Sequence, residues 1–175
     1  MRAGLLDQFP SEVPITVLAT GTDFYARAAA KRAGLTLLPL AEAGARPAIA
    51  DANVIIDGLD LIADPVAALR ELRRTTTGIR VFALISNGAY SVTLLNFLAG
   101  DELRAAHPLV AADLEPLFAQ GGWRVVDRSA LVDRSIAHGP IPYAVSNRGF
   151  SVTVTSAEIG ERLTTAGFLV VADPQ

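Results

Sequence analysis

The stretch from Asn53 to Val126 constrains the fold more than any other part of the chain, because it alternates between two hydrophobic patterns. Short apolar or β-branched runs, typical of buried strands, are separated by longer amphipathic runs that are typical of helices. These are strands at 54–56, 81–85 and 123–126, and helices at 64–74, 92–98 and 111–119. Such alternation is typical of a mainly parallel sheet with helices on both faces. We therefore predict an α/β fold, a three-layer α/β/α sandwich around a doubly wound sheet.

The flanking segments follow the same alternation. They predict strands at 15–19, 35–40, 150–154 and 168–172, and helices at 24–33 and 157–166. At 175 residues, the chain is long enough to form one domain with a substantial core. We expect a single domain over residues 1–175, with 1–13 as a lead-in and 156–175 as an extra helix-strand tail.

The composition narrows the classes of function. Hydrophobic residues make up 51% and charged residues 19% of the chain, which is typical of a folded, core-rich protein. There is no cysteine, and the two histidines (His107 and His138) lie far apart, so we expect no metal site. A net charge of −3 with a single lysine argues against a nucleic-acid groove. No apolar run approaches roughly 18 residues and no signal peptide is evident, so we expect a cytoplasmic protein without a membrane partner.

The landmarks between Asp57 and Val126 occur in a characteristic order. In one-letter code they are DGLDLIADP (57–65), LRELRR (69–74), SN (86–87) and HPLVAADLEPLFAQGGWRVV (107–126). This order and spacing resemble the second half of the class I S-adenosylmethionine-dependent methyltransferases, which carry a pattern like D-x-L-E-H-x-x-D-P at the first landmark. Leu61 stands where that family often has histidine. The resemblance covers roughly residues 15–154.

The resemblance implies a fold and an activity. The fold is a seven-stranded sandwich with a thinned cofactor half, in which strands near Trp123 and Phe150 form an antiparallel edge hairpin. The activity is methyl transfer from S-adenosylmethionine to a hydroxyl or amine of a small molecule or glycan. His107 and Asp57 are then the candidate catalytic bases. The alternative for His107 is a structural residue that fastens a lid.

The cofactor residues of the family match this chain poorly. The family's first motif is an acidic residue followed by G-x-G-x-G, whereas residues 19–25 read ATGTDFY. Ala19 replaces the acid, Gly21 is retained, and Asp23 and Tyr25 replace the next two glycines. Asp23 is equally an ordinary helix cap. The candidate cofactor-binding residues are Thr20, Gly21, Thr22, Asp23, Glu42, Asp57, Gly58 and Leu59.

The segment between the second strand and Val54 is also short. Glu42, the nearest candidate for the acid that binds the ribose, comes one or two residues late, and an ordinary loop glutamate is the alternative. About a dozen residues remain before Val54, too few for the family's usual helix, strand and helix. Each cofactor group that loses its partner on burial costs about 1–3 kcal/mol.

Two hypotheses of function follow. One is a methyltransferase-like enzyme with a degenerate cofactor site. The other is a non-catalytic scaffold or partner-binding module of a larger system, with a protein as its partner. Both hypotheses leave a homo-oligomer open. An acid pair among Asp57, Asp60 and Asp64 is less favoured, because Asp60 and Asp64 are ordinary for a loop and a cap. Aromatic side chains either line an acceptor pocket or belong to the core; they are Tyr90, Phe97, Tyr143 and Phe150.

Overall fold

The computed structural model describes residues 5–10, 12–21, 23–32, 34–40, 53–76, 78–102, 105–136 and 139–175. The predictions for Thr22, Glu42 and His138 fall outside these residues. The strands are β1 (Ile15–Ala19), β2 (Leu35–Pro39), β3 (Asn53–Asp57), β4 (Val81–Ser86), β5 (Trp123–Val132), β6 (Tyr143–Asn147), β7 (Phe150–Val154) and β8 (Thr165–Pro174). The helices are α2 (Asp23–Ala29), the short 3-10 helix η2 (Leu59–Leu61), α3 (Pro65–Thr75), α4 (Ser91–Leu98), α5 (Ala111–Gln120) and α6 (Ala157–Thr164).

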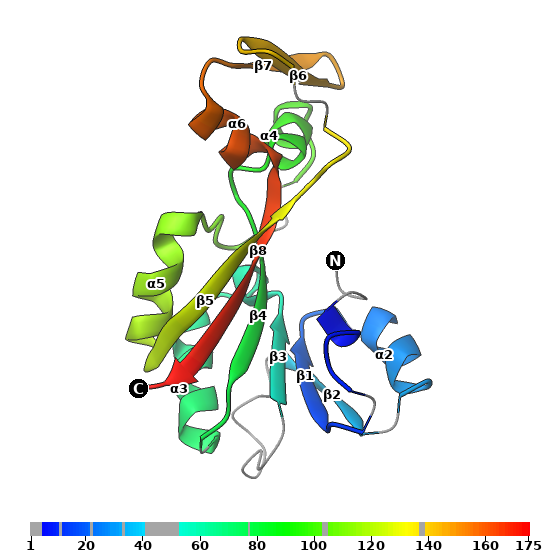
Figure 1. The fold of residues 1–175 in the computed structure, drawn as a ribbon, viewed down its shortest axis with the longest axis vertical. Helices are drawn as coiled ribbons and strands as arrows, with labels where there is room; N and C mark the ends of the chain where they lie inside the picture. Colours follow the sequence, from blue (N-terminus) through cyan, green and yellow to red (C-terminus); the bar gives the residue numbers. More distant parts are fainter. Residues whose placement is uncertain are drawn as a thin grey trace.

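Within the described residues, six strands form one sheet in the order β2-β1-β3-β4-β8-β5 (Figure 1). The first four strands are parallel, and β8 is antiparallel to both β4 and β5. The chain moves outward from β1 to β2 and then returns to the other side of β1 with β3. The carboxyl ends of β1 and β3 therefore flank the point where the strand order reverses, which is where ligands bind in open α/β sheets.

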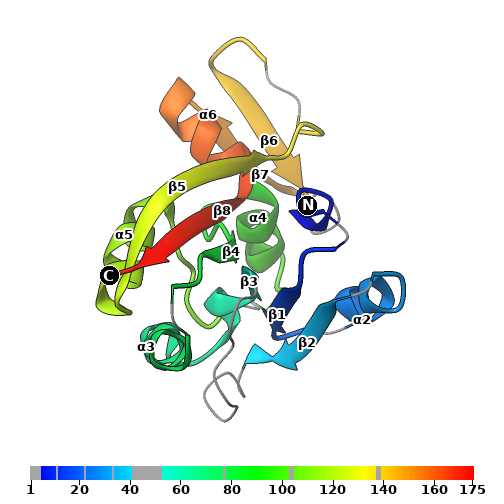
Figure 2. The same ribbon diagram turned by 60° about the horizontal axis from the view of Figure 1, so that its bottom comes forward.

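Helices cover both faces of the sheet (Figure 2). Successive strand residues point to opposite faces, so Val54 and Ile56 join one core cluster while Ile55 joins the other. The first cluster lies under α3 and α5, and the second lies under α2 and includes Leu5 and Leu6. The α/β sandwich predicted from the sequence is confirmed.

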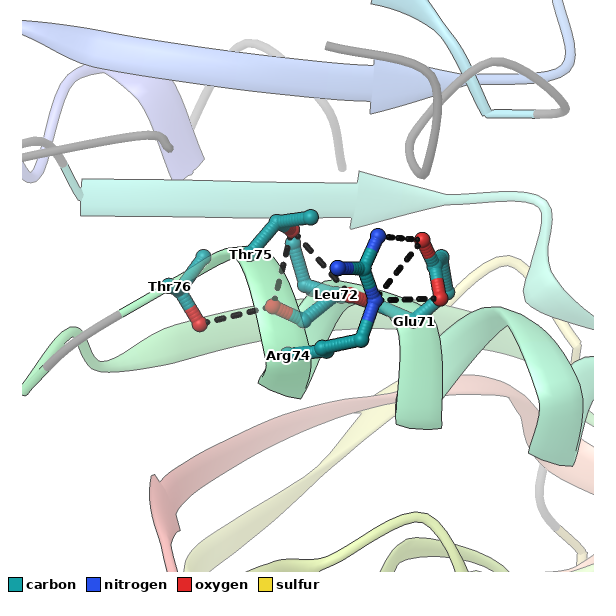
Figure 3. A network of polar contacts seen from close by, with 5 residues as sticks. All are labelled: Glu71, Leu72, Arg74, Thr75 and Thr76. Carbon is teal, nitrogen blue, oxygen red and sulfur yellow. Dashed lines mark hydrogen bonds and ion pairs between the residues drawn. The ribbon is translucent and has the colours of Figure 1, made fainter. Parts of the chain in front are cut away.

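The sequence explains where α3 begins and ends. Asp64 caps the first turn by accepting the Ala67 N–H at 2.8 Å, and Pro65 occupies the first helical position. At the other end, the Thr76 hydroxyl donates to the carbonyl of Leu72 at 2.8 Å, and the Thr75 hydroxyl lies 3.1 Å from the same carbonyl (Figure 3). Glu71 and Arg74 form an ion pair on the exposed side of this turn, as Figure 3 shows. Local polar contacts thus end the helix.

The predicted pairing of the antiparallel strands was wrong. The strand at Trp123 pairs with β8, and the strand at Phe150 pairs with β6 in a separate two-stranded sheet. A two-residue turn, Arg148-Gly149, joins β6 to β7, and both of its residues have positive φ. Such turns match the twist of the strands, so the local hairpin forms in preference to a distant pairing.

Two further segments differ from the sequence reading. Residues 143–147, for which no strand was predicted, form β6. Residues 156–175, expected to be an extra tail, supply α6 and the strand that lies between β4 and β5. β8 is ten residues long and largely buried, so the tail completes the core.

Candidate functional site

The switch point brings together the ends of β1 and β3. The Thr20 N–H, just after β1, donates to the Asp57 carbonyl at the end of β3 at 3.1 Å. The side chain of Thr20 also lies against Gly58, because a Cβ placed on Gly58 would be 2.1 Å from the Thr20 hydroxyl oxygen. Gly58 has φ +94°, a left-handed conformation that favours glycine. Because Gly58 has no side chain, the side chain of Thr20 can lie against its backbone.

Asp57 is held by the helix that follows β1. The Tyr25 hydroxyl donates to the Asp57 carboxylate at 2.8 Å. Both side chains are buried, with exposed fractions of 0% for Tyr25 and 8% for Asp57. Tyr25 occupies the position of the family's third glycine, so a large side chain that reaches the strand end replaces a residue with none.

Gly21 behaves differently from Gly58. A Cβ at Gly21 would meet no atom within 4 Å. Thr20 and Gly21 are exposed, as is Asp23, which begins α2 and supplies the acidic group of its first turn. These residues are therefore at the surface of the strand end, while the link between Tyr25 and Asp57 lies beneath it.

Asp60 is a site residue that the sequence analysis set aside as an ordinary loop position. It is 2% exposed, and within the described part of the chain its Oδ2 atom has no hydrogen-bond partner. Burial raises the pKa of the Asp60 carboxyl, and the nearby Asp57 charge adds to the rise, whereas hydrogen bonds from Ser86 oppose it. The available signal was its alignment with the glutamate of the family's D-x-L-E-H pattern.

His107 fastens the loop before α5 to η2 and the turn that follows it. Its backbone N–H donates to the Asp60 carbonyl at 3.0 Å, and its ring Nε2 lies 2.8 Å from the Ala63 carbonyl oxygen. Because a carbonyl oxygen only accepts, Nε2 carries the proton in this contact. The neighbouring Pro108 packs on Gly88, where a Cβ would be 2.7 Å away. The geometry therefore agrees with the structural alternative for His107.

Two other predicted landmarks have structural roles. Leu59 is fully buried and packs in the core cluster under α3 and α5. The Asn87 amide donates to the carbonyls of Arg162 and Thr165 at 2.9 and 2.8 Å, and its oxygen accepts the Ala89 N–H at 3.1 Å. Asn87 therefore joins the end of β4 to the end of α6 and the start of β8.

The ends of β1 and β2 are apolar. β1 ends in Ala19, which is 1% exposed, and β2 ends in Pro39, followed by Leu40 at 3% exposed. Ala19, Pro39 and Leu40 themselves carry no side-chain acceptor for a ribose hydroxyl. Across the described residues, no group of three or more histidines or acids could hold a metal ion. None of the described helices combines the length and the hydropathy that a membrane crossing requires.

Known structures resemble this chain over nearly its whole length. A methyltransferase from Archaeoglobus fulgidus described as SAM-dependent is 12% identical with a TM-score of 0.61, and the match covers 99% of this chain and 91% of that one. Magnesium protoporphyrin IX methyltransferase from Synechocystis, with bound SAH, is 12% identical with a TM-score of 0.53, over 99% and 80%.

A third similar chain comes from the complex that contains the Haloferax volcanii Trm112 methyltransferase activator. It is 18% identical with a TM-score of 0.59, and the match covers 99% of this chain and 87% of that chain. No protein-family model and no curated protein matches the sequence. Together with the strand order and the layers, the structural matches show that this chain has the fold of the class I S-adenosylmethionine-dependent methyltransferases.

Proposed function

We propose that this chain is a non-catalytic methyltransferase-fold domain that binds a partner and does not transfer methyl groups. The observation that carries the proposal is the hydrogen bond from Tyr25 to Asp57 beneath the switch point. In this arrangement the chain's own hydroxyl satisfies the acid at the end of β3. Thr20 fills the space over Gly58 in the same way.

The apolar residues at the ends of β1 and β2 support this proposal. The described strand ends of β1 and β2 carry alanine, proline and leucine. Each ribose hydroxyl buried there without an acceptor would cost about 1–3 kcal/mol, which weakens binding by roughly one to two orders of magnitude. The described residues thus fit S-adenosylmethionine poorly, and we derive no chemical step through it.

The proposal also includes a binding partner, and two observations support a protein in that role. One of the similar structures comes from a complex that contains a methyltransferase activator. In this chain, large apolar side chains remain exposed on α4 and on the β6–β7 hairpin. Exposed apolar patches are typical of protein interaction sites.

Calorimetry with S-adenosylmethionine and S-adenosylhomocysteine tests the proposal directly. We expect no heat of binding and no rise in Tm at millimolar ligand. Binding in the micromolar range would overturn the proposal, provided that Gly21→Val abolishes it. A Cβ at Gly21 would meet no atom within 4 Å, so we expect valine to occupy the strand end without disturbing the fold. Thr36→Val, at an exposed position of β2, is the matched control.

Methyl transfer to a hydroxyl or amine of a small molecule or glycan is the second candidate function, and Asp60 is the observation that favours it. A buried carboxyl with an unpartnered oxygen and a raised pKa costs stability, and such groups concentrate at functional sites. Under this reading Asp57 or His107 would act as the base. The same titration separates the two functions, because transfer requires the cofactor to bind.

A further inference from the structure

Exposed apolar side chains concentrate at one end of the molecule. We call this end the cap: α4, α6, the β6–β7 hairpin, the end of β5 at Val132 and the segments that join them to the sheet, at the top of Figure 1. Of the eight large hydrophobic residues exposed within the described ranges, only Leu61 and Val126 lie outside it. The six in the cap are Phe97, Leu98, Val132, Ile141, Phe150 and Ile159, each between 37% and 53% exposed.

Helix α4 is the clearest case of an apolar surface without enough cover. Its eight residues read SVTLLNFL, so five of them are large and apolar. Among those five only Leu95 is buried, whereas Phe97 and Leu98 are 50% and 53% exposed. A helix that is hydrophobic on all sides is normally buried on all sides. The composition of α4 is therefore that of a helix with a further packing partner.

The exposed residues of α4 and the hairpin are neighbours. The Asn147 amide at the end of β6 donates to the Asn96 side chain of α4 at 2.8 Å. Phe150 pairs directly with Asn147 across the hairpin, and directly opposed residues point to the same face of a sheet. Phe150 therefore lies on the hairpin face that contacts α4, beside the turn that carries Phe97.

The hairpin turn is held in place at a conformational cost. Arg148 has φ 47° and is the only non-glycine residue with positive φ in the described part of the chain. Its guanidinium contacts both carboxylate oxygens of Asp101, just after α4, at 2.8 and 2.9 Å. Strained residues persist where the surrounding structure fixes them, often at binding surfaces. The ion pair is thus a second link, besides that of Asn147 with Asn96, between the hairpin and the end of α4.

We propose that the cap is the interface with a second copy of this chain, which names the partner for the partner-binding function above and rests on that function. A standard interface buries about 800 Å² per partner, of which about 56–65% is apolar. Six large side chains that are roughly half exposed supply on the order of 500 Å² of apolar surface. The cap thus has the apolar area of one standard dimer interface.

The charges of the cap also suit a two-fold interface. Such an interface joins a surface to itself, so the surface must carry groups that complement their own copies. Arg148 with Asp101, and Arg162 with Glu158, place one positive and one negative group in each pair beside the apolar residues. A surface for a strongly charged partner would instead carry one sign of charge.

Sedimentation velocity of the full chain from about 1 to 100 μM, chosen to span weak to moderate affinities, tests this inference. We expect a species of twice the 18.4 kDa of one chain, in equilibrium with monomer. Phe97→Ser and Phe150→Ser should each raise the dimer dissociation constant at least about tenfold, as for residues at the centre of an interface. Val126→Ser, at an equally exposed position of β5 outside the cap, should leave it unchanged.

A monomer at every concentration would overturn the inference, and so would a dimer that neither Phe97→Ser nor Phe150→Ser weakens. Circular dichroism establishes that each variant is folded, and Ile159→Ser offers a second cap position on α6 if Phe97→Ser does not fold. A wild-type monomer that binds a different protein through the cap would also overturn it. The mass does not depend on S-adenosylmethionine, so failure of this inference is distinct from failure of the proposed function.

Discussion

The part of the chain from β3 to the start of β5 keeps the landmarks of the methyltransferase fold, whereas the part from β1 to β2 keeps the strands and departs from the family's sequence pattern for cofactor binding. In the first part, Leu69, Phe118 and Trp123 are all fully buried within one core cluster. In the second, Ala19, Asp23 and Tyr25 stand where the family has its acid and its glycines. The strands of both parts belong to one sheet, so the two parts differ in their strand-end residues and not in their fold.

The difference separates residues that packing requires from residues that a ligand requires. A core position constrains size and hydrophobicity in any protein that keeps the fold. A glycine at a strand end is constrained only while a ligand must approach the backbone there. Under this reading His107 and Asn87 belong to the first group, because their side chains bond to backbone carbonyls of neighbouring segments.

Trp123→Ala should give the largest loss of stability. Its ring is fully buried, and its indole N–H donates to the Leu69 carbonyl in α3 at 2.9 Å. Removal of this side chain should lower the free energy of unfolding by about 3–5 kcal/mol, measured by urea denaturation followed by circular dichroism. Val126→Ala, exposed on the same strand, is the control and should cost less than about 0.5 kcal/mol. A similar loss in both variants would show that burial of Trp123 in the core cluster under α3 and α5 contributes little to stability.

Tyr25→Phe should have the next largest effect, because it removes the donor to a buried carboxyl. We expect a loss of about 1–3 kcal/mol. A double-mutant cycle with Asp57→Ala isolates the contact, and the losses in the two single variants should together exceed the loss in the double variant by more than about 0.5 kcal/mol. Simple additivity would mean that Tyr25 and Asp57 are not coupled, and the two parts of the chain would then differ less than we argue.

The sequence was sufficient where local signals and burial agree. Asp64-Pro65 predicted the start of α3, and the glycines after α5 predicted its end. The sequence was insufficient for β6, where no strand was predicted. It was also insufficient for the place of β8 in the sheet, because its neighbours β4 and β5 are distant in the chain. Pairings between distant strands depend on the whole sheet and leave no local signal.

The site was less predictable than the fold for the same reason. Asp57 and Gly58 were identified from the resemblance, but the contact of Asp57 with Tyr25 joins residues 32 positions apart. The burial of Asp60 is likewise a tertiary property of a residue type that is usually exposed. Its raised pKa follows from that burial, which no short motif records.

Asp60→Asn should change stability in the opposite direction. The pKa of Asp60 is raised in the folded state, so its contribution to stability is greatest below the unfolded value of 3.8 and is lost as pH rises through the folded-state pKa. At pH 7 the buried carboxyl should therefore be a net cost, and asparagine should raise the free energy of unfolding by on the order of 1 kcal/mol. The gain should shrink toward pH 4. A less stable variant at pH 7 would show that the ionised carboxylate is well satisfied, and that this strand end keeps a ligand-type acid after all.

Tyr90→Phe should give the smallest effect, and it tests whether polar links on the cap side are structural. The Tyr90 hydroxyl, just before α4, donates to Asp133 after β5. Burial and the Asp133 carboxylate raise the pKa of Tyr90 to about 12. Because the folded-state pKa lies above the ordinary 10.0, this contribution is complete below pH 10 and disappears between pH 10 and about 12. We expect the variant to lower Tm by no more than about 3 °C at pH 8, with the difference vanishing by pH 12. An equal difference at both values would mean that the phenol stabilises by packing, and the link between β5 and α4 would not depend on its proton.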